Sequence, residues 1–162
     1  MNKFDTYVAQ NRLDLVRGTM VFEDCVFSRS QTEKILSNEV VPNLDYKLVC
    51  GVRNVNRAWS WVCSPKEYGV STLEELHAIV SEDVIRVPWL EGTFRDEKIP
   101  VVISSSSYSP PLTSRAEAYN EFDRKLTFVL NKLRGYQSVE KKVKICLDLF
   151  IFLMKRQYFI DV

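Results

Sequence analysis

The run of apolar residues from Val143 to Met154 constrains the fold more than any other part of the sequence. It reads Val-Lys-Ile-Cys-Leu-Asp-Leu-Phe-Ile-Phe-Leu-Met and is apolar on nearly every face of a helix. A helix of this kind normally lies at the buried centre of a domain. It is too short to span a bilayer, and Lys144 and Asp148 interrupt it, so we expect a core helix and no membrane partner. Only residues 155–162 follow, so the sequence predicts a helical fold that is interrupted just after its central helix.

The composition is that of one compact domain. The 162 residues are 46% hydrophobic, which is enough for a real core. Because 22 basic residues are balanced by 21 acidic ones, we expect no general attraction to nucleic acid or to a membrane surface. Residues 1–5 contain no apolar segment typical of a secretory signal. The four cysteines lack CxxC spacing, so we expect reduced, buried thiols, no metal site and a cytoplasmic protein.

Helix signals dominate the chain. Apolar residues at steps of three and four predict one long amphipathic helix from about Leu44 to Cys63 and another that starts near Arg115. In a capping box, a hydroxyl and a carboxylate or amide three residues later each bind the other's free backbone N–H. Three such pairs predict helix starts: Ser28 with Gln31, Ser71 with Glu74, and Ser114 with Glu117.

The stretch from Val87 to Pro111 has a different pattern. A polar turn at residues 96–98 separates Thr93-Phe94-Arg95 from a β-branched run, Ile99 to Ile103, which predicts a two-stranded hairpin. Because Pro100 lacks an N–H, the second strand is expected at an edge, where an extended peptide could pair with it. The predicted fold class is therefore mainly α with one small β-hairpin.

Three segments, in the expected order, resemble the Fic domain proteins, whose enzymes transfer AMP from ATP to a protein hydroxyl. Residues 19–24 and the short capped helix after them resemble the inhibitory-helix region of that family. Gly92-Thr93-Phe94-Arg95, with Val101, Ile103, Tyr108 and the pair Pro110-Pro111, resembles the hairpin that the family calls its flap. Gln157-Tyr158-Phe159-Ile160-Asp161 follows the apolar helix at the place where the active-site motif of the family opens.

The resemblance implies a single Fic-like domain over residues 1–162. Within it, residues 1–40 would form the inhibitory-helix-like region and residues 41–86 a set of helices. Residues 87–111 would form the flap hairpin, and residues 112–162 the helices up to the active-site motif. The target protein would then bind through the flap, whose candidate contact residues are Gly92, Phe94, Arg95, Val101 and Ile103.

The active-site motif departs from the family pattern. That pattern begins with His, followed by Phe two residues later, then by an acidic residue, Gly, Asn and, two residues on, Arg. Gln157 stands at the His position, Phe159 and Asp161 match, and Val162 stands at the Gly position. The Asn and Arg have no counterpart in these 162 residues.

These departures bear directly on activity. In the family the His takes a proton from the target hydroxyl, and an amide cannot act as that general base near neutral pH. The Gly, Asn and Arg hold the phosphates, so the family cofactors ATP and Mg²⁺ are not expected to bind this chain. By resemblance Asp161 would hold the magnesium ion, and the alternative is an ordinary acidic residue. We therefore expect this chain to be inactive as a transferase.

Thr19 and Glu23 have the spacing of the inhibitory motif, although Asp24 replaces the Gly or Asn of the family. In the family this Glu pairs with the active-site Arg and prevents productive seating of the γ-phosphate, through a carboxylate–guanidinium contact. That Arg has no counterpart here, and the alternative for Glu23 is a solvated residue at a helix end. The only histidine, His77, lies within a helical pattern without a Ser or Cys partner nearby, and is expected to pack or to face solvent.

Two functions remain open from the sequence. The first is a Fic-like protein AMP-transferase whose catalytic part is missing from this chain, and the second is a non-catalytic protein-binding or regulatory module derived from a Fic domain. An unrelated helical DNA regulator is a more remote third, because no recognition-helix pattern or basic patch supports it. The coding sequence beyond residue 162 would discriminate the first two. In either case the interrupted core should leave an apolar surface that promotes self-association.

Overall fold

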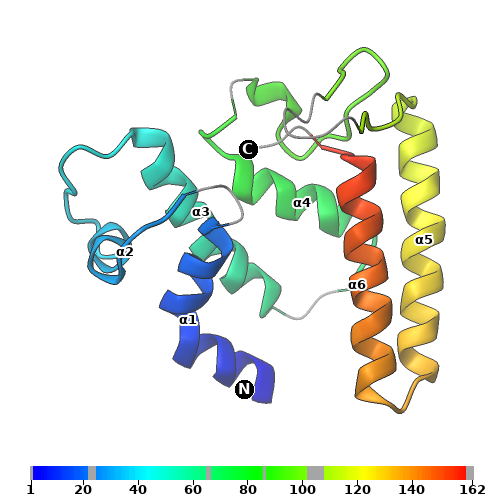
Figure 1. Cartoon of the computed structure of the whole chain (residues 1–162), viewed down its shortest axis with the longest axis horizontal. Coiled ribbons are helices and arrows are strands. Elements are labelled where there is room, and N and C mark those ends of the chain that lie inside the picture. The colour runs from blue at the N-terminus through cyan, green and yellow to red at the C-terminus, as the bar shows by residue number, and fades with distance from the viewer. Residues whose placement is uncertain (1, 22–24, 65–66, 86, 102–107, 160–162) are drawn as a thin grey trace. The chain divides into compact units, whose positions relative to one another are not determined.

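The computed structural model describes residues 2–21, 25–64, 67–85, 87–101 and 108–159. Within these ranges the chain forms six α-helices and one 3₁₀ turn, and no strand (Figure 1). The prediction of a mainly α fold is therefore confirmed. The chain divides into two compact units, one made of Met1–Glu67 with Glu75–Gly92 and the other of Tyr68–Glu74 with Thr93–Asp161.

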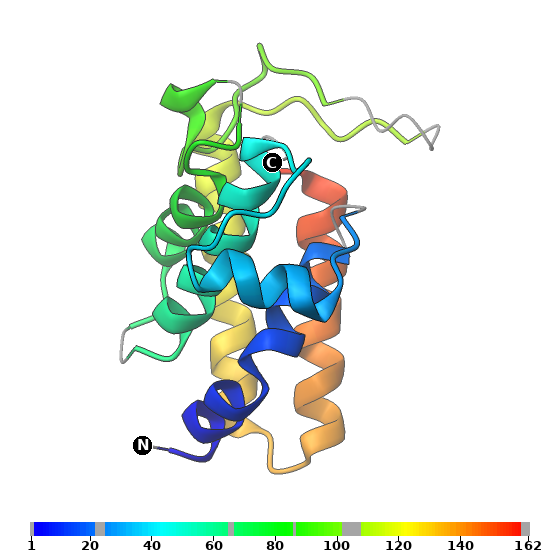
Figure 2. The same cartoon turned by 90° about the vertical axis from the view of Figure 1, so that its left-hand side faces the viewer.

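The first unit is built on three helices that contact one another: α1 (Lys3–Val21), α2 (Arg29–Leu36) and α3 (Tyr46–Val62) (Figure 2). Most of α4 (Val70–Ser81) and the 3₁₀ turn η1 (Pro88–Leu90) also belong to this unit. The three helices bury one apolar cluster, which consists of Val16, Met20, Phe27, Ile35, Val52 and Val55. The predicted long amphipathic helix is confirmed as α3, which starts after Asp45 because that carboxylate accepts a hydrogen bond from Lys47 N at 2.7 Å.

The second unit is an antiparallel pair, α5 (Arg115–Gly135) and α6 (Val139–Arg156), which lie side by side in Figures 1 and 2. The first turn of α4 and the segment after η1 complete it. Its buried cluster consists of Val70, Phe94, Ala118, Phe122 and Tyr158. The cluster thus joins residues from four segments that are distant in the sequence.

Two of the three predicted capping boxes are present. Ser28 with Gln31 opens α2, Ser114 with Glu117 opens α5, and both reciprocal hydrogen bonds exist in each. The third prediction, Ser71 with Glu74, is wrong because α4 begins at Val70. At that start Gly69 N donates to Thr72 Oγ1 at 2.8 Å, so the hydroxyl of Thr72 satisfies the free N–H.

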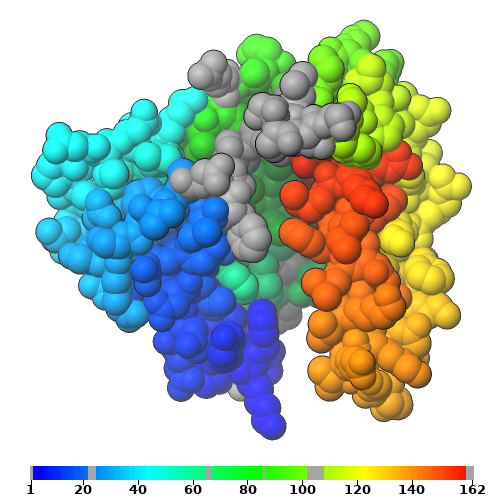
Figure 3. Space-filling view, viewed as in Figure 1, coloured from blue at the N-terminus to red at the C-terminus, as the bar shows by residue number. Residues whose placement is uncertain are grey.

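The apolar helix is not buried on every face. Ile145 is the buried residue of α6, and Leu149, Phe152 and Leu153 pack against the core of the second unit from the same side. The other side exposes an apolar stripe at steps of three and four, whose side chains are 49–75% exposed: Val139, Val143, Leu147, Phe150, Ile151 and Met154. Figure 3 shows α6 in orange to red on the visible surface. A single neighbouring helix, α5, can cover only one side of α6, so the expected fully buried helix is wrong for this unit.

The predicted hairpin is also wrong over the residues that the structure describes. Residues 93–101 contain no strand, and residues 102–107, including Ile103, lie outside the described ranges. The polar turn does form, because Ile99 N donates to Asp96 O at 3.1 Å. However, Arg95 N donates to Tyr158 O at 2.8 Å, so this backbone pairs with the chain after α6 and not with a second strand. Pairing of a target peptide along a free hairpin edge loses its basis.

The cysteines differ in their exposure. All four are free thiols, as expected, and Cys50 is buried. Cys25 and Cys63 are partly buried, whereas Cys146 is exposed on α6, so the expectation of uniform burial is wrong. Among the described residues, no helix has both the length and the apolar character that crossing a membrane requires.

Candidate functional site

Arg95 joins the segment after η1 to the C-terminal end of α6, and this junction is the candidate site. The Arg95 side chain is almost fully buried, with 4% of the residue exposed. Its Nε donates to the Gln157 carbonyl, and its Nη2 donates to Arg156 O at 2.9 Å and to Pro111 O at 3.1 Å. A longer contact of 3.4 Å runs from Nη1 to Ile99 O. Among the described residues, this one guanidinium thus binds four backbone carbonyls from three segments.

The physical reason for this arrangement is the end of a helix. The last carbonyls of an α-helix have no partner inside the helix and carry a partial negative charge. A guanidinium, with five N–H groups and a permanent positive charge, satisfies several such carbonyls at once. Arg95 therefore fixes the position of residues 156–158 relative to residues 95–99 and 111.

Phe94 anchors the same junction on its apolar side. It is fully buried, and its ring centroid lies 5.4 Å from that of Tyr158 and 4.7 Å from that of Phe159. The rings of Tyr119 and Phe122 lie 6.1 and 6.2 Å away. These separations are typical of tilted aromatic pairs, which add to the free energy gained from burial. Arg115 Nε also donates to the Phe94 carbonyl at 2.8 Å.

Glu121 on α5 holds the other side of the α6 terminus. Its Oε2 accepts a hydrogen bond from the Tyr158 hydroxyl at 2.9 Å, and its Oε1 pairs with the Arg156 guanidinium. Burial raises the pKa of the Tyr158 hydroxyl above its usual value, and the hydrogen bond to Glu121 raises that pKa further. Tyr158 therefore stays neutral and acts as a hydrogen-bond donor throughout the physiological pH range.

Gln157 terminates α6 in the left-handed conformation, with φ 46° and ψ 59°. Its backbone N donates to Leu153 O at 3.0 Å, and its side-chain Nε2 donates to Met154 O at 3.1 Å. The amide thus caps the helix end that it belongs to. It has no group that takes up a proton near neutral pH, so it cannot serve as a general base in this position.

The described residues at this junction do not fit ATP. Phosphates bind where backbone N–H groups converge, as at the start of a helix. Here the groups that converge are the carbonyls of residues 156–158, and Arg95 already occupies them. No cluster of three or more potential metal ligands occurs in the part of the chain that the structure describes, and Asp161 lies outside it. Over residues 93–101 and 108–159, the groups that converge at this junction are carbonyls bound by Arg95, and the expectation that this chain binds neither ATP nor Mg²⁺ stays a prediction.

The remaining predicted site residues lie elsewhere. Thr19 is in the first unit, where its Oγ1 donates to Leu15 O at 2.9 Å and accepts from Trp59 Nε1 at 3.2 Å. Gly92, with φ 66°, is also in that unit, and its N donates to His77 Nδ1 at 2.9 Å. This contact gives the buried His77 the packing role expected for it. Val101 is partly buried, and Glu23 and Ile103 lie outside the described residues.

The sequence reasoning identified Phe94, Arg95 and Gln157, and the second unit brings these three together. It missed Glu121 and Tyr158, which complete the junction. Glu121 lies among other charged residues on α5, and Tyr158 lies beside the motif residues without matching any of them. Glu121 and Tyr158 are 37 positions apart, so no local sequence pattern indicates that they pair.

No protein-family model matches this chain, and no curated protein matches it either.

Proposed function

We propose that this chain is a Fic-like domain of the protein AMP-transferase type that lacks a competent base at position 157. The observation that best supports the proposal is the junction formed by Arg95. This junction brings together two of the three segments on which the resemblance rests. Here Arg95, in the flap-like segment, binds the carbonyls of Arg156 and Gln157, where the motif-like residues begin.

AMP transfer needs a base for the target hydroxyl and an anchor for the nucleotide. The amide of Gln157 caps α6 and cannot take the proton. The Gly-Asn-x-x-Arg pattern that holds the phosphates in the family does not occur in these 162 residues. The proposal therefore assigns the domain type and predicts that this chain transfers no AMP by the family mechanism.

A graft tests the domain type directly. Residues 93–159 would replace the corresponding segment of an active Fic enzyme, once with Gln157 and once with Gln157→His. We expect the His chimera to label its target protein with AMP and the Gln chimera to be at least a hundredfold slower, because general-base catalysis contributes about 10²–10⁴-fold. The two chimeras differ in one side chain, so each is the folding control for the other. A folded His chimera without activity would overturn the assignment.

The prediction of inactivity has its own test. The 162-residue chain, incubated with labelled ATP, Mg²⁺ and a cell lysate, should yield no labelled protein. Label that accumulates with time, survives denaturation and depends on this chain would contradict the prediction. Inorganic phosphate released without protein labelling would indicate a different chemistry.

A second candidate is a non-catalytic protein-binding module derived from the same fold. The apolar stripe of α6 favours it, since six apolar side chains on one side of a helix are exposed. A module of this kind needs no base at position 157. Crosslinking from a photoreactive residue at position 147, compared with one at position 132 on α5, would test it. A protein crosslinked from position 147 alone supports the module, and equal crosslinking from both positions contradicts it.

A further inference from the structure

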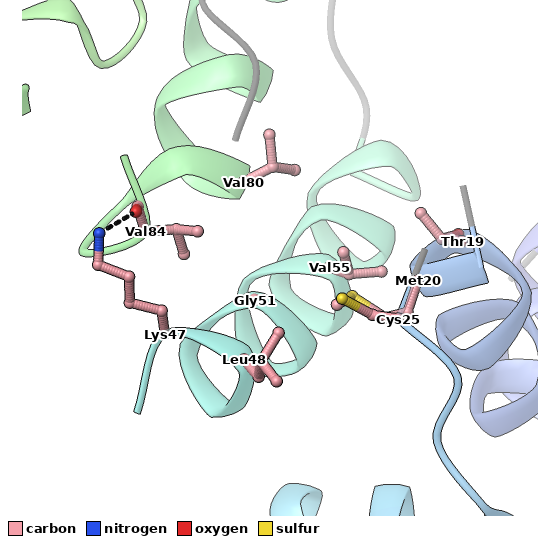
Figure 4. Close-up of a pocket in the computed structure, with 9 residues that line it drawn as sticks. All are labelled: Thr19, Met20, Cys25, Lys47, Leu48, Gly51, Val55, Val80 and Val84. Atoms are coloured by element: carbon pink, nitrogen blue, oxygen red, sulfur yellow. Dashed lines mark hydrogen bonds between the residues drawn. The ribbon is translucent and has the colours of Figure 1, made fainter. Parts of the chain in front are cut away.

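We propose that the first unit holds a binding site for a small monocarboxylate with an apolar chain. The site is a pocket between the end of α1, the first half of α3 and the end of α4 (Figure 4). Its lining residues are Thr19, Met20, Cys25, Lys47, Leu48, Gly51, Val55, Val80 and Val84. All of them belong to the first unit, so the site is independent of the junction at Arg95 and of the function proposed above.

The size of the pocket limits the ligand. Its volume is about 240 Å³. An apolar cavity of about 150 Å³ binds benzene, and one water-sized group occupies about 30 Å³ of liquid volume. The pocket therefore accommodates a chain of about eight carbon atoms or a single substituted ring. Larger lipids with long acyl chains exceed it.

The walls are apolar. Figure 4 shows the side chains of Leu48, Val55, Val80 and Val84 around the opening, with the sulfur atoms of Met20 and Cys25 at one end. The polar group of Thr19 is engaged, because its hydroxyl donates to Leu15 O and accepts from Trp59 Nε1. A ligand with polar groups along its length would lose its hydrogen bonds to water in this environment. The walls thus favour a hydrocarbon chain.

Gly51 keeps the pocket open on the α3 side. It is buried in the middle of a helix, where Gly costs about 1 kcal/mol relative to Ala. A Cβ at this position would meet Met20 Cε at 3.3 Å. Because Gly51 has no side chain, the Met20 side chain can pack against the backbone of α3, and that backbone forms part of the pocket wall.

Lys47 supplies the charge that selects the head group. Its Nζ donates to Val84 O at 2.9 Å, which places the ammonium at the rim (Figure 4). An ammonium has three N–H groups, so the bond to Val84 leaves donors for a ligand. Among the described residues Lys47 forms no ion pair; the neighbouring Asp45 carboxylate accepts from the Lys47 backbone N and caps α3. A carboxylate at the end of the apolar chain would meet this ammonium.

The rate at which the Cys25 thiol is alkylated reports whether a ligand occupies the pocket, and this measurement does not depend on the unfolding free energy of the protein. The full chain would be treated with N-ethylmaleimide in the presence of octanoate, octanol or octylamine. The extent of modification of each cysteine would be measured over time by peptide mass mapping. We expect octanoate to slow the labelling of Cys25 and to leave Cys63, which is also partly buried, unchanged. Octanol should bind about two- to fivefold more weakly, as expected for loss of one exposed ion pair, and octylamine more weakly still.

Variants locate the binding. Gly51→Leu fills the pocket and should abolish octanoate protection, whereas Gly18→Leu, at an exposed helix position with open space around it, should not. Val84→Phe fills the pocket from the opposite wall and should also abolish octanoate protection, so it replaces Gly51→Leu in the test if Gly51→Leu does not fold. Lys47→Met should make octanoate and octanol bind equally. Equal protection of Cys25 and Cys63 by octanoate would overturn the proposal. Protection of Cys25 that persists in folded Val84→Phe, or no protection of Cys25 by octanoate at millimolar concentration, would also overturn it.

Discussion

Replacing Arg95 should destabilise the second unit selectively. Arg95 is 4% exposed and donates to four carbonyls, three of which lie within 3.1 Å of a donor nitrogen or closer. Hydrogen bonds from a charged donor each contribute about 1.5–3 kcal/mol, and their effects are not additive. Arg95→Met leaves neutral carbonyls of the junction without this donor, and each buried polar group left unsatisfied costs about 1–3 kcal/mol. We therefore expect Arg95→Met to lower the unfolding free energy of this unit by about 3–5 kcal/mol.

The tryptophans allow the two units to be followed separately. Trp59, Trp61 and Trp89 all belong to the first unit, so their fluorescence in a urea titration reports that unit alone. Far-UV ellipticity also reports α5 and α6. With a slope of about 1–2 kcal/mol per molar urea for a unit of this size, the ellipticity transition of the second unit should move down by about 1.5–5 M. The fluorescence transition should stay in place.

Two further variants make the test strict. Arg95→Lys keeps the charge but loses the planar fork, and should cost about half as much as Arg95→Met. Arg124→Met is the matched control, since Arg124 is exposed and its one hydrogen bond to the described residues goes to Asn120 O within its own helix. A loss below about 0.5 kcal/mol for Arg95→Met, or a loss equal to that of Arg124→Met, would refute the role given to this side chain.

Three other outcomes are expected. Folding raises the pKa of Tyr158 above its usual value of 10.0, so the neutral hydroxyl contributes stability below pH 10, and this contribution is lost as the pH rises further. Urea unfolding measured at pH 8–11 should show the loss of stability, and Tyr158→Phe should remove that pH dependence. Ser114→Ala should lower the unfolding free energy by about 1 kcal/mol through loss of the α5 cap, which thermal melts followed by ellipticity can measure, and an unchanged melt would contradict the capping box. The apolar stripe of α6 should cause self-association at high concentration, so Leu147→Asp with Ile151→Asp should lower the mass measured by light scattering, and an unchanged mass would exclude the stripe as the contact.

Local signals in the sequence predicted local structure well. Apolar spacing predicted α3 and α5, and the two confirmed capping boxes fixed where α2 and α5 begin. These features depend on residues within one or two turns of each other, which the sequence displays directly. The failed box at Ser71 shows the limit, because α4 begins at Val70 and Thr72, not Glu74, accepts the hydrogen bond from the residue before the helix, Gly69.

Features that depend on distant partners were not predictable in the same way. The β-branched run after residue 98 suggested a strand, but a strand needs a partner, and Arg95 pairs with Tyr158 in its place. The composition of α6 suggested burial, but burial depends on how many neighbours surround the helix. The resemblance pointed to Phe94 and Arg95 as flap residues and to Gln157 as the first motif position, but only the structure shows that they meet at one junction. Glu121 could likewise be recognised only when α5 and α6 were seen together.

The interleaving of the two units has a consequence for the order in which the protein folds during synthesis. The buried cluster of the first unit runs from Val16 to Val55, so its partners leave the ribosome early. The cluster of the second unit joins Val70 to Tyr158, 88 positions later, and cannot be complete until Tyr158 has been made. Contacts between residues so far apart form slowly because a long loop must close first. The first unit should therefore be structured while Val70 and Phe94 are still exposed, and that interval is when a chaperone or a nearby nascent chain would encounter them.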